Sequence, residues 1–237
     1  MLVLLKNKDM ANHCFTTYKI LGTEKAVKDL FTTIEALQTT VKGLDECSDS
    51  DFLESILKTH GLENVFEDLK TQTTIRLWLG DLAEHYGINC EEREINDRGH
   101  ICFVKYETIE KEDKHLLTVK TDTAWIGCSS LFNAINEVLG DELSISYREW
   151  EWGTEYFCVH DEGGFFPEEC IALGLGKPFE ELYYAYFDTI EAAIHEWCFR
   201  MGVERGCKSQ EEMVDYIHNY VYKDEDTYFV IYEIYIV

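Results

Sequence analysis

The amino-acid sequence predicts an α+β fold built around a split βαβ core. Segments of alternating polarity, typical of strands, are interspersed with segments of helical periodicity, in the order β-α, then β-β-α-β-β, then α-α-β. No internal repeat and no linker rich in Gly, Ser or Pro interrupts this order. Of the 237 residues, 46% are hydrophobic and only 2 are Pro, so the composition excludes a disordered or low-complexity chain.

The N-terminal segments predict one strand and one long helix. His13–Leu21 alternates between two faces and is expected to form the strand, which Gly22 ends. Thr23 is placed to cap the helix that follows. The apolar stripe of this helix is Val27, Leu30, Phe31 and Ile34. Residues 44–87 then predict a helical insertion, with short helices at 51–61, near 64–69 and over Thr74–Tyr86.

The central segments predict the rest of the sheet. Strands are expected at Cys90–Ile95, His100–Thr108, Leu116–Thr123, Leu143–Trp150 and Tyr156–His160. Ser129 or Ser130 is expected to cap an intervening helix, whose apolar stripe is Leu131, Phe132, Ile135 and Val138. A split βαβ order places both helical stripes against the same face of one sheet.

Residues 171–237 predict an acidic C-terminal α/β extension. Asp188 with Glu191 marks the start of one helix, and Ser209 with Glu212 forms a capping-box pattern for another. Thr227–Val237 is aromatic and β-branched, which predicts a final strand.

Charge is the strongest global signal. The chain has 46 acidic and 21 basic residues, a formal net charge of -25. The excess is concentrated after Thr121, where 24 acidic residues face 6 basic ones (24 − 6 = 18 negative charges in excess). This balance argues against direct binding of nucleic acid and against an anionic membrane surface. Two interpretations remain: a surface charge that keeps the protein in solution, or a face that binds a partner whose usual ligand is DNA or another anion.

The 9 cysteines predict a reducing compartment, most simply the cytoplasm. They are odd in number, form no Cys-x-x-Cys pair and sit mostly beside apolar neighbours, where a free thiol packs as a small hydrophobe.

Three short motifs resemble a known family. Met10-Ala11-Asn12-His13-Cys14 precedes the first strand, Thr123-Ala124-Trp125 precedes a helix, and Ser144-Ile145-Ser146-Tyr147 leads to Glu149, Glu151 and Gly153. These motifs resemble the YubB-like ferredoxin-like domain family of plasmid, phage and mobile-element proteins, over residues 10–170. His13 and Thr16 depart from the Trp and Asn usual in that family. The resemblance implies a ferredoxin-like sandwich and a start at Met10, with residues 1–9 as an artefact or a short extension. The family has no established catalytic residues, so the resemblance assigns none to this chain.

Several constellations carry chemistry in principle. Cys158 and His160 share a strand face and suit a nucleophile with its base, or two metal ligands, although a solvated sheet face explains them as well. His195 and Cys198 lie one helical turn apart and would complete a zinc set with that pair, but Cys198 also falls on an apolar stripe. The aromatic run Tyr183, Tyr184, Tyr186 and Phe187 offers a small-ligand site.

The binding residues predicted from the sequence lie at a strand-to-helix junction and at a hairpin end. Trp125 lies at a strand-to-helix junction, where a hydrophobic plug is the plainer interpretation. Trp150 and Trp152 alternate with carboxylates near a hairpin tip, which suits a contact patch. The predicted set is Trp125, Trp150, Trp152, Glu149, Glu151 and Glu155.

The sequence therefore predicts a cytoplasmic, non-catalytic accessory protein of a mobile element. No P-loop, Rossmann fingerprint, nucleophile elbow or His-Glu-x-x-His motif is present, which argues against the common enzyme classes. We expect no cofactor and no metal. The expected partner is a protein bound through an acidic face, with a basic nucleic-acid-binding protein as the candidate, and with neither direct nucleic-acid nor membrane binding. The alternatives are an enzyme using the Cys158–His160 pair and a small-ligand binder.

Overall fold

The computed structural model describes residues 13–42, 73–109, 114–151, 156–179, 183–223 and 227–237. The chain divides into two compact units. The first comprises the residues up to Tyr156 together with His160–Phe165. The second comprises Phe157–Val159 and Phe166–Val237. The expected helices at 51–61 and 64–69 lie outside the described residues.

The first unit is a mixed α/β unit with an antiparallel sheet. Its elements are β1 (His13–Gly22), α1 (Glu24–Leu37), β2 (Thr39–Lys42), β3 (Thr73–Trp78), α4 (Leu79–His85), β4 (Gly99–Ile109), β5 (Lys114–Ala124), α5 (Ser129–Val138) and β6 (Leu143–Glu151). The strand order is β6-β1-β5-β4-β3-β2, and each neighbouring pair is antiparallel. The helix α1 precedes β4 in the chain, and α5 joins β5 to β6.

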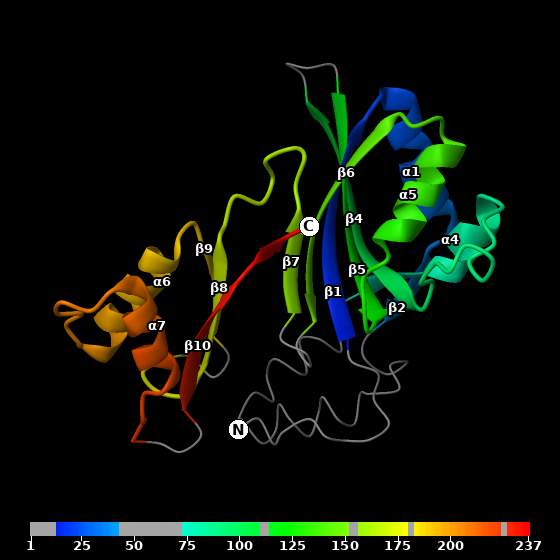
Figure 1. Cartoon of the computed structure of the whole chain (residues 1–237). Coiled ribbons are helices and arrows are strands. Elements are labelled where there is room, and N and C mark those ends of the chain that lie inside the picture. The colour runs from blue at the N-terminus through cyan, green and yellow to red at the C-terminus, as the bar shows by residue number, and fades with distance from the viewer. Residues whose placement is uncertain (1–12, 43–72, 110–113, 152–155, 180–182, 224–226) are drawn as a thin grey trace. The chain divides into compact units, whose positions relative to one another are not determined.

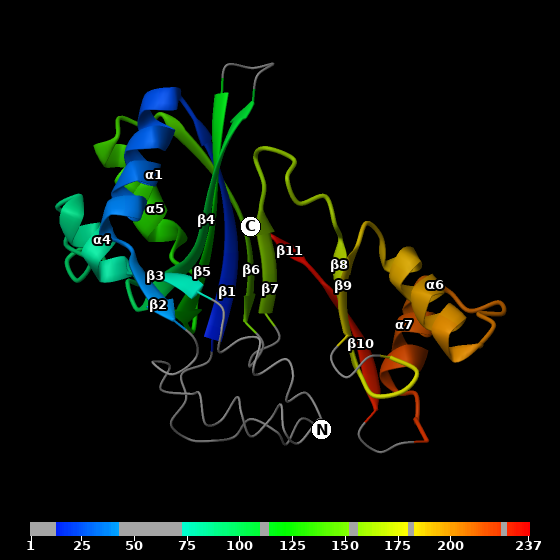
Figure 2. The ribbon, with the colours of Figure 1, turned by 180° about the vertical axis from the view of Figure 1, so that it is seen from behind.

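Both long helices of this unit cover the same face of the sheet, as predicted (Figures 1 and 2). Leu30 of α1 and Phe132 of α5 are buried in one cluster with Tyr18 and Val119 of the strands. Each fully buried side chain of this size contributes about 1.5–3 kcal/mol. Val138 departs from the prediction, because at the end of α5 it is 53% exposed.

Capping residues set two of the helix starts in the expected places, and Thr189 instead of Asp188 caps α6. The Thr23 hydroxyl accepts a hydrogen bond from the Ala26 N–H, and Ser209 and Glu212 form the reciprocal capping box. The expected cap at Ser129 or Ser130 is wrong, because α5 begins after Cys128 and has no side-chain cap. The Cys128 N–H instead donates to the Tyr18 hydroxyl at 2.9 Å.

Two further element predictions are wrong. Thr74–Tyr86 is not one helix but β3 followed by α4. Leu77 and Trp78 pair with β4, so tertiary strand pairing overrides the helical periodicity of this segment. Cys90–Ile95 forms turns instead of a strand, closed by a hydrogen bond from the Ile95 N–H to the Cys90 carbonyl.

The second unit also combines helices with strands. Its elements are β8 (Cys170–Leu175), β9 (Tyr183–Phe187), α6 (Ile190–Met201), α7 (Gln210–His218), β10 (Tyr228–Glu233) and β11 (Tyr235–Ile236). The antiparallel order is β10-β8-β9, and both helices pack on these strands around Trp197. The strand β7 (Tyr156–His160) contributes residues to both units, and its Cys158 pairs with Tyr235 of β11. β8 and β9 were not expected from the sequence, and the expected final strand is broken between β10 and β11.

No helix in the described ranges is both long enough and apolar enough to cross a membrane.

Candidate functional site

The face of the first sheet that lies opposite α1 and α5 carries rows of aromatic and cationic side chains. We call it the open face, because none of the described helices of the first unit packs on it (Figures 1 and 2). Residues in register across antiparallel strands project to the same side, so the pairing register defines each row. Rows two residues apart on a strand are separated by about 6.7 Å.

The first row is aromatic. It runs across five strands and consists of Trp78, His100, Asp122, Phe15 and Trp150. Trp78 contacts His100 edge-on with 4.9 Å between ring centroids, and Phe15 contacts Trp150 edge-on at 6.0 Å. Phe15 is 39% exposed and Trp78 is 41% exposed, so both rings present area to solvent.

The next two rows carry the positive charge. The second consists of Phe103, Lys120, Thr17 and Arg148, and the third of Lys105, Thr118, Lys19 and Ser146. The Lys120 ammonium lies 5.4 Å from the Phe103 ring centroid, in a cation–π arrangement. Four cations from β1, β4, β5 and β6 thereby lie in two adjacent rows, with one threonine between the two cations of each row.

The charges in these rows act on one another. Burial lowers the pKa of Lys19, Glu107 opposes that shift, and Lys105, Lys120 and Arg148 lower the pKa further. The Lys19 ammonium also donates to the Thr118 hydroxyl at 3.0 Å. Mutual repulsion of this kind is relieved when an anion binds.

The described carboxylates on the open face are paired. Asp122 contacts His13 at 2.8 Å, and Glu107 accepts from Lys105 at 2.8 Å. Asp122 belongs to the aromatic row and Glu107 lies one row beyond the cationic ones. The open face is therefore polarised, with its positive charge in the two central rows.

The predicted residues Glu149 and Glu151 lie on the helix side of the sheet, where both are buried. A Glu149 carboxylate oxygen accepts a hydrogen bond from the Gly127 N–H at 2.8 Å. A Cβ atom added at Gly127 would lie 2.3 Å from the other carboxylate oxygen and 2.9 Å from the Thr16 hydroxyl. The close approach explains why glycine occupies this position, and it gives Glu149 a structural role in the β5–α5 connection.

The predicted residue Trp125 is held at the surface by the same connection. Its backbone adopts φ 74°, which is rare for a non-glycine residue, and its side chain is 54% exposed. The Ile126 carbonyl beside it accepts from Thr123 Oγ1 at 2.7 Å and from Asn96 Nδ2 at 2.8 Å. These bonds fix the strained corner, so Trp125 is not the buried plug that a junction tryptophan usually forms.

The remaining members of the predicted set are separated from one another. Trp150 is half-buried on the open face beside Phe15, on the opposite side of β6 from Glu149. Trp152 and Glu155 lie outside the described residues. The structure thus places Trp150 in the aromatic row and assigns the buried glutamates to the core.

The Cys158–His160 pair lies outside the two cavities described next. Two cavities formed by described residues, of about 410 and 340 Å³, are lined by the α4 region and by the β1–α1 turn with 141–144, and neither includes Cys158 or His160. His160 stacks on Tyr147 and lies 3.7 Å from Glu162. Within the described ranges, no three His, Cys, Asp or Glu side chains form a group that could hold a metal ion.

The fold buries part of each of the two other constellations. Cys198 is half-buried against the core of the second unit, and burial raises the pKa of its thiol. In the aromatic run of β9, Tyr183 is buried against Phe179 and Phe229, while Tyr184 is 54% exposed. Strand alternation separates these tyrosines, so they do not form a single surface.

The cations and phenylalanines of the open face were not among the residues predicted from the sequence. The only sequence signal was the alternation of β1, which puts Phe15, Thr17 and Lys19 on one face. Lys105, Lys120 and Arg148 join them through pairing between distant segments, which no local pattern reports.

Neither the protein-family models, nor the curated proteins, nor the solved structures compared with this chain include a match to it.

Proposed function

We propose that this protein is a non-catalytic binding protein whose first unit holds an anionic macromolecule on the open face. The carrying observation is the convergence of Lys19, Lys105, Lys120 and Arg148 from four strands onto two adjacent rows of one sheet face. Charge complementarity at such a face raises the association rate and selects an anionic partner.

The net charge of -25 does not oppose this proposal. A ligand in contact with the sheet responds mainly to charges within a Debye length, about 8–10 Å at physiological salt. The expectation that nucleic acid is not bound directly came from charge counted along the chain. Such a count adds together all charges of the chain, whereas the strand register brings Lys19, Lys105, Lys120 and Arg148 onto one face of the sheet.

A non-catalytic role is supported by the state of the thiols. Burial raises the pKa of Cys14 and of Cys170, and it raises the pKa of Cys128 to about 12. Such thiols are protonated at neutral pH and are poor nucleophiles. The Cys158–His160 pair lines neither of the two cavities described above.

We also propose that the first unit has the ferredoxin-like topology. The order β6-β1-β5-β4 with antiparallel pairing, and the two long helices on one face, support a split βαβ arrangement to which β3, α4 and β2 are additions. Membership of the YubB-like family, and a mobile-element origin, stay proposals that rest on the three motifs. A cytoplasmic location is supported by the absence of disulfides among the described cysteines.

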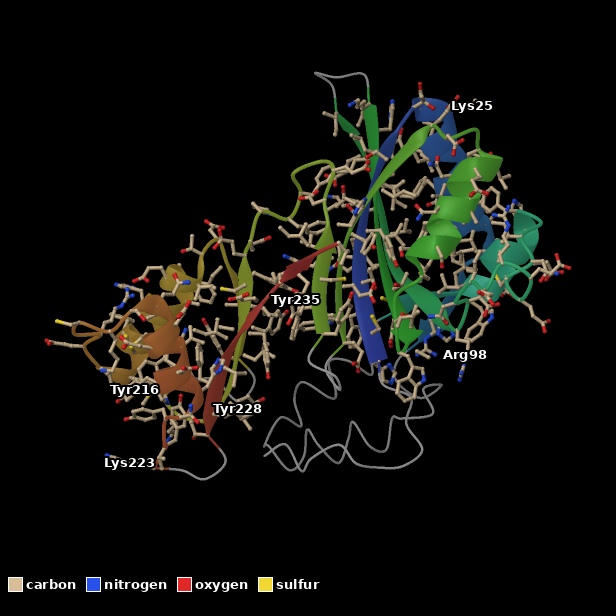
Figure 3. The ribbon with its side chains drawn as sticks, viewed as in Figure 1. Lys25, Arg98, Tyr216, Lys223, Tyr228 and Tyr235 are labelled. Atoms are coloured by element: carbon tan, nitrogen blue, oxygen red, sulfur yellow. The ribbon has the colours of Figure 1, made fainter. Side chains whose placement is uncertain are left out.

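The test of the proposed function is retention on immobilised heparin at about 50 mM NaCl. The face variant is Lys105→Gln with Lys120→Gln. The matched control is Lys25→Gln with Lys28→Gln on α1, which removes the same charge from the opposite side of the sheet (Figure 3). Lys28 pairs with Glu24 much as Lys105 pairs with Glu107, so the two variants also disturb one ion pair each.

We expect the wild type and the control to be retained, and the face variant to elute at lower salt. Thermal unfolding of all three proteins checks that they are folded. Absence of retention for the wild type, or an equal loss in the control variant, would overturn the proposed function.

A further inference from the structure

The open face carries exposed phenyl rings as well as cations, and this combination narrows the chemistry of its ligand. Phe15 and Phe103 are each 39% exposed on central strands. Trp150 lies beside Phe15 in the aromatic row, and Trp78 lies at the other end of that row. A ligand that only neutralised charge would leave these rings in water. A ligand with flat apolar faces as well as negative charge satisfies both features.

We propose that the ligand of the open face is single-stranded nucleic acid, whose bases stack on Phe15 and Phe103 and whose phosphates contact the cationic rows. This inference rests on the proposed function and names its ligand class. Stacking platforms interleaved with Lys and Arg are the common physical solution for binding unpaired strands without sequence preference.

The distribution of charge on the open face determines where the bases and where the phosphates of a bound nucleic-acid strand lie. Asp122 lies in the aromatic row, paired with His13, and disfavours a phosphate there. The next two rows hold Lys120 and Arg148, then Lys105 and Lys19. A base on Phe15 therefore has its phosphate over the second row, about 6.7 Å further along β1.

In the second row, Phe103 and Lys120 together offer a ring for the base and an ammonium for the phosphate of one nucleotide. Lys120 lies over the Phe103 ring at 5.4 Å, so the ring and the ammonium occupy one site from two neighbouring strands. A base that stacks on Phe103 brings its own phosphate within reach of that ammonium. The cation–π contact thus keeps the lysine positioned before the ligand arrives.

Other anionic macromolecules fit the face less well. A nucleic-acid duplex hides its base faces inside the stack, and a sulfated polysaccharide has no π-face to place on phenylalanine. An acidic protein segment would neutralise the lysines but would depend little on ring chemistry. These ligands are the alternative outcomes of the experiment.

The experiment measures fluorescence anisotropy of labelled 12-nucleotide dT and rU strands and of a 12-base-pair duplex, with full-length protein at about 0.1 M NaCl. Phe15→Leu and Phe103→Leu remove the π-face and keep an apolar side chain of similar volume. The matched control is Phe199→Leu, since Phe199 is 77% exposed on α6 of the second unit.

We expect both single strands to bind more tightly than the duplex. We expect each face variant to lose about fivefold or more in affinity for the single strands, the lower limit for one base–aromatic stack. The Phe199→Leu control should bind the single strands with the affinity of the wild type. The two face variants should be retained on heparin as strongly as the wild type. Comparison of dT with rU shows whether the 2′-hydroxyl contributes.

The two proposals fail in different ways. If heparin retains the wild type through Lys105 and Lys120, but the duplex binds as tightly as the single strands or the leucine variants bind like the wild type, the ligand assignment is overturned and the proposed function stands. If neither heparin nor any oligonucleotide binds, the proposed function itself fails.

Discussion

The ammonium of Lys120 on β5 lies 5.4 Å from the centre of the Phe103 ring on β4. The two residues are direct partners in the antiparallel register, at the point where a shift between Ile101 and Phe103 adds one residue to β4. Without this shift, alternation would turn Phe103 toward the helix side and Cys102 toward the open face. The irregularity in β4 therefore assembles part of the candidate ligand-binding face.

Salt dependence measures how many cations contact the ligand. Each phosphate contact on a single strand contributes about 0.7 to the slope of log K against log salt concentration. Replacing Lys105 and Lys120 with Gln should reduce the slope for the dT strand by about 1.4. Anisotropy titrations from about 0.05 to 0.3 M NaCl give the slope. An unchanged slope would show that these lysines do not touch phosphates.

Gly127→Ala should destabilise the first unit by about 1–3 kcal/mol through overpacking. The new methyl group would meet the buried Glu149 carboxylate, which cannot withdraw without giving up its hydrogen bond from the residue 127 N–H. Urea unfolding measures the change. Glu149→Ala removes the obstacle, so the double variant should cost less than the sum of the two single ones. Strict additivity would contradict this account.

Alkaline pH should weaken the fold between about pH 9 and pH 12. An exposed thiol loses its proton near pH 9.0, while the buried Cys128 thiol keeps its proton until about pH 12. The unfolded state then binds fewer protons than the folded state, so the free energy of unfolding falls as the pH rises. The slope is about 1.4 kcal/mol per pH unit for each such group.

Urea unfolding at pH 8 and pH 10.5 measures this loss for the wild type and for Cys128→Ala. The variant should lose less stability between the two pH values, although Cys14 and Tyr18, whose pKa values burial also raises, continue to contribute. Equal losses in the two proteins would exclude Cys128 as a source of the pH dependence.

The acidic face expected from the sequence makes a separate prediction. If the carboxylates after Thr121 form a concentrated face, their mutual repulsion should lower the melting temperature at low salt. Unfolding at about 0.01 M and 0.5 M NaCl tests this, because the Debye length falls from about 30 Å to below 10 Å. A melting temperature that does not change with salt would favour a dispersed, solubilising charge.

Local patterns predicted the elements whose signals lie within a few residues. The Thr23 cap and the stripe around Leu30 gave α1, and the Ser209–Glu212 capping box gave α7. The alternation of β1 gave its two faces correctly. The short apolar run of β8 was missed, and β3 was predicted as the start of a helix, since periodicity over so few residues does not distinguish a strand from a helix or a loop.

The amino-acid sequence by itself determined that the chain is an acidic α+β protein containing α1 and α7, and that Phe15 and Lys19 share a face of β1. Only the tertiary structure decided which residues join them. Lys105, Lys120 and Arg148 reach that face through the strand register and the irregularity in β4, and Glu149 is turned to the opposite, buried side of β6. Register depends on pairing between segments more than a hundred residues apart, such as those of Thr17 and Arg148, and a shift of one residue reverses every side chain of a strand.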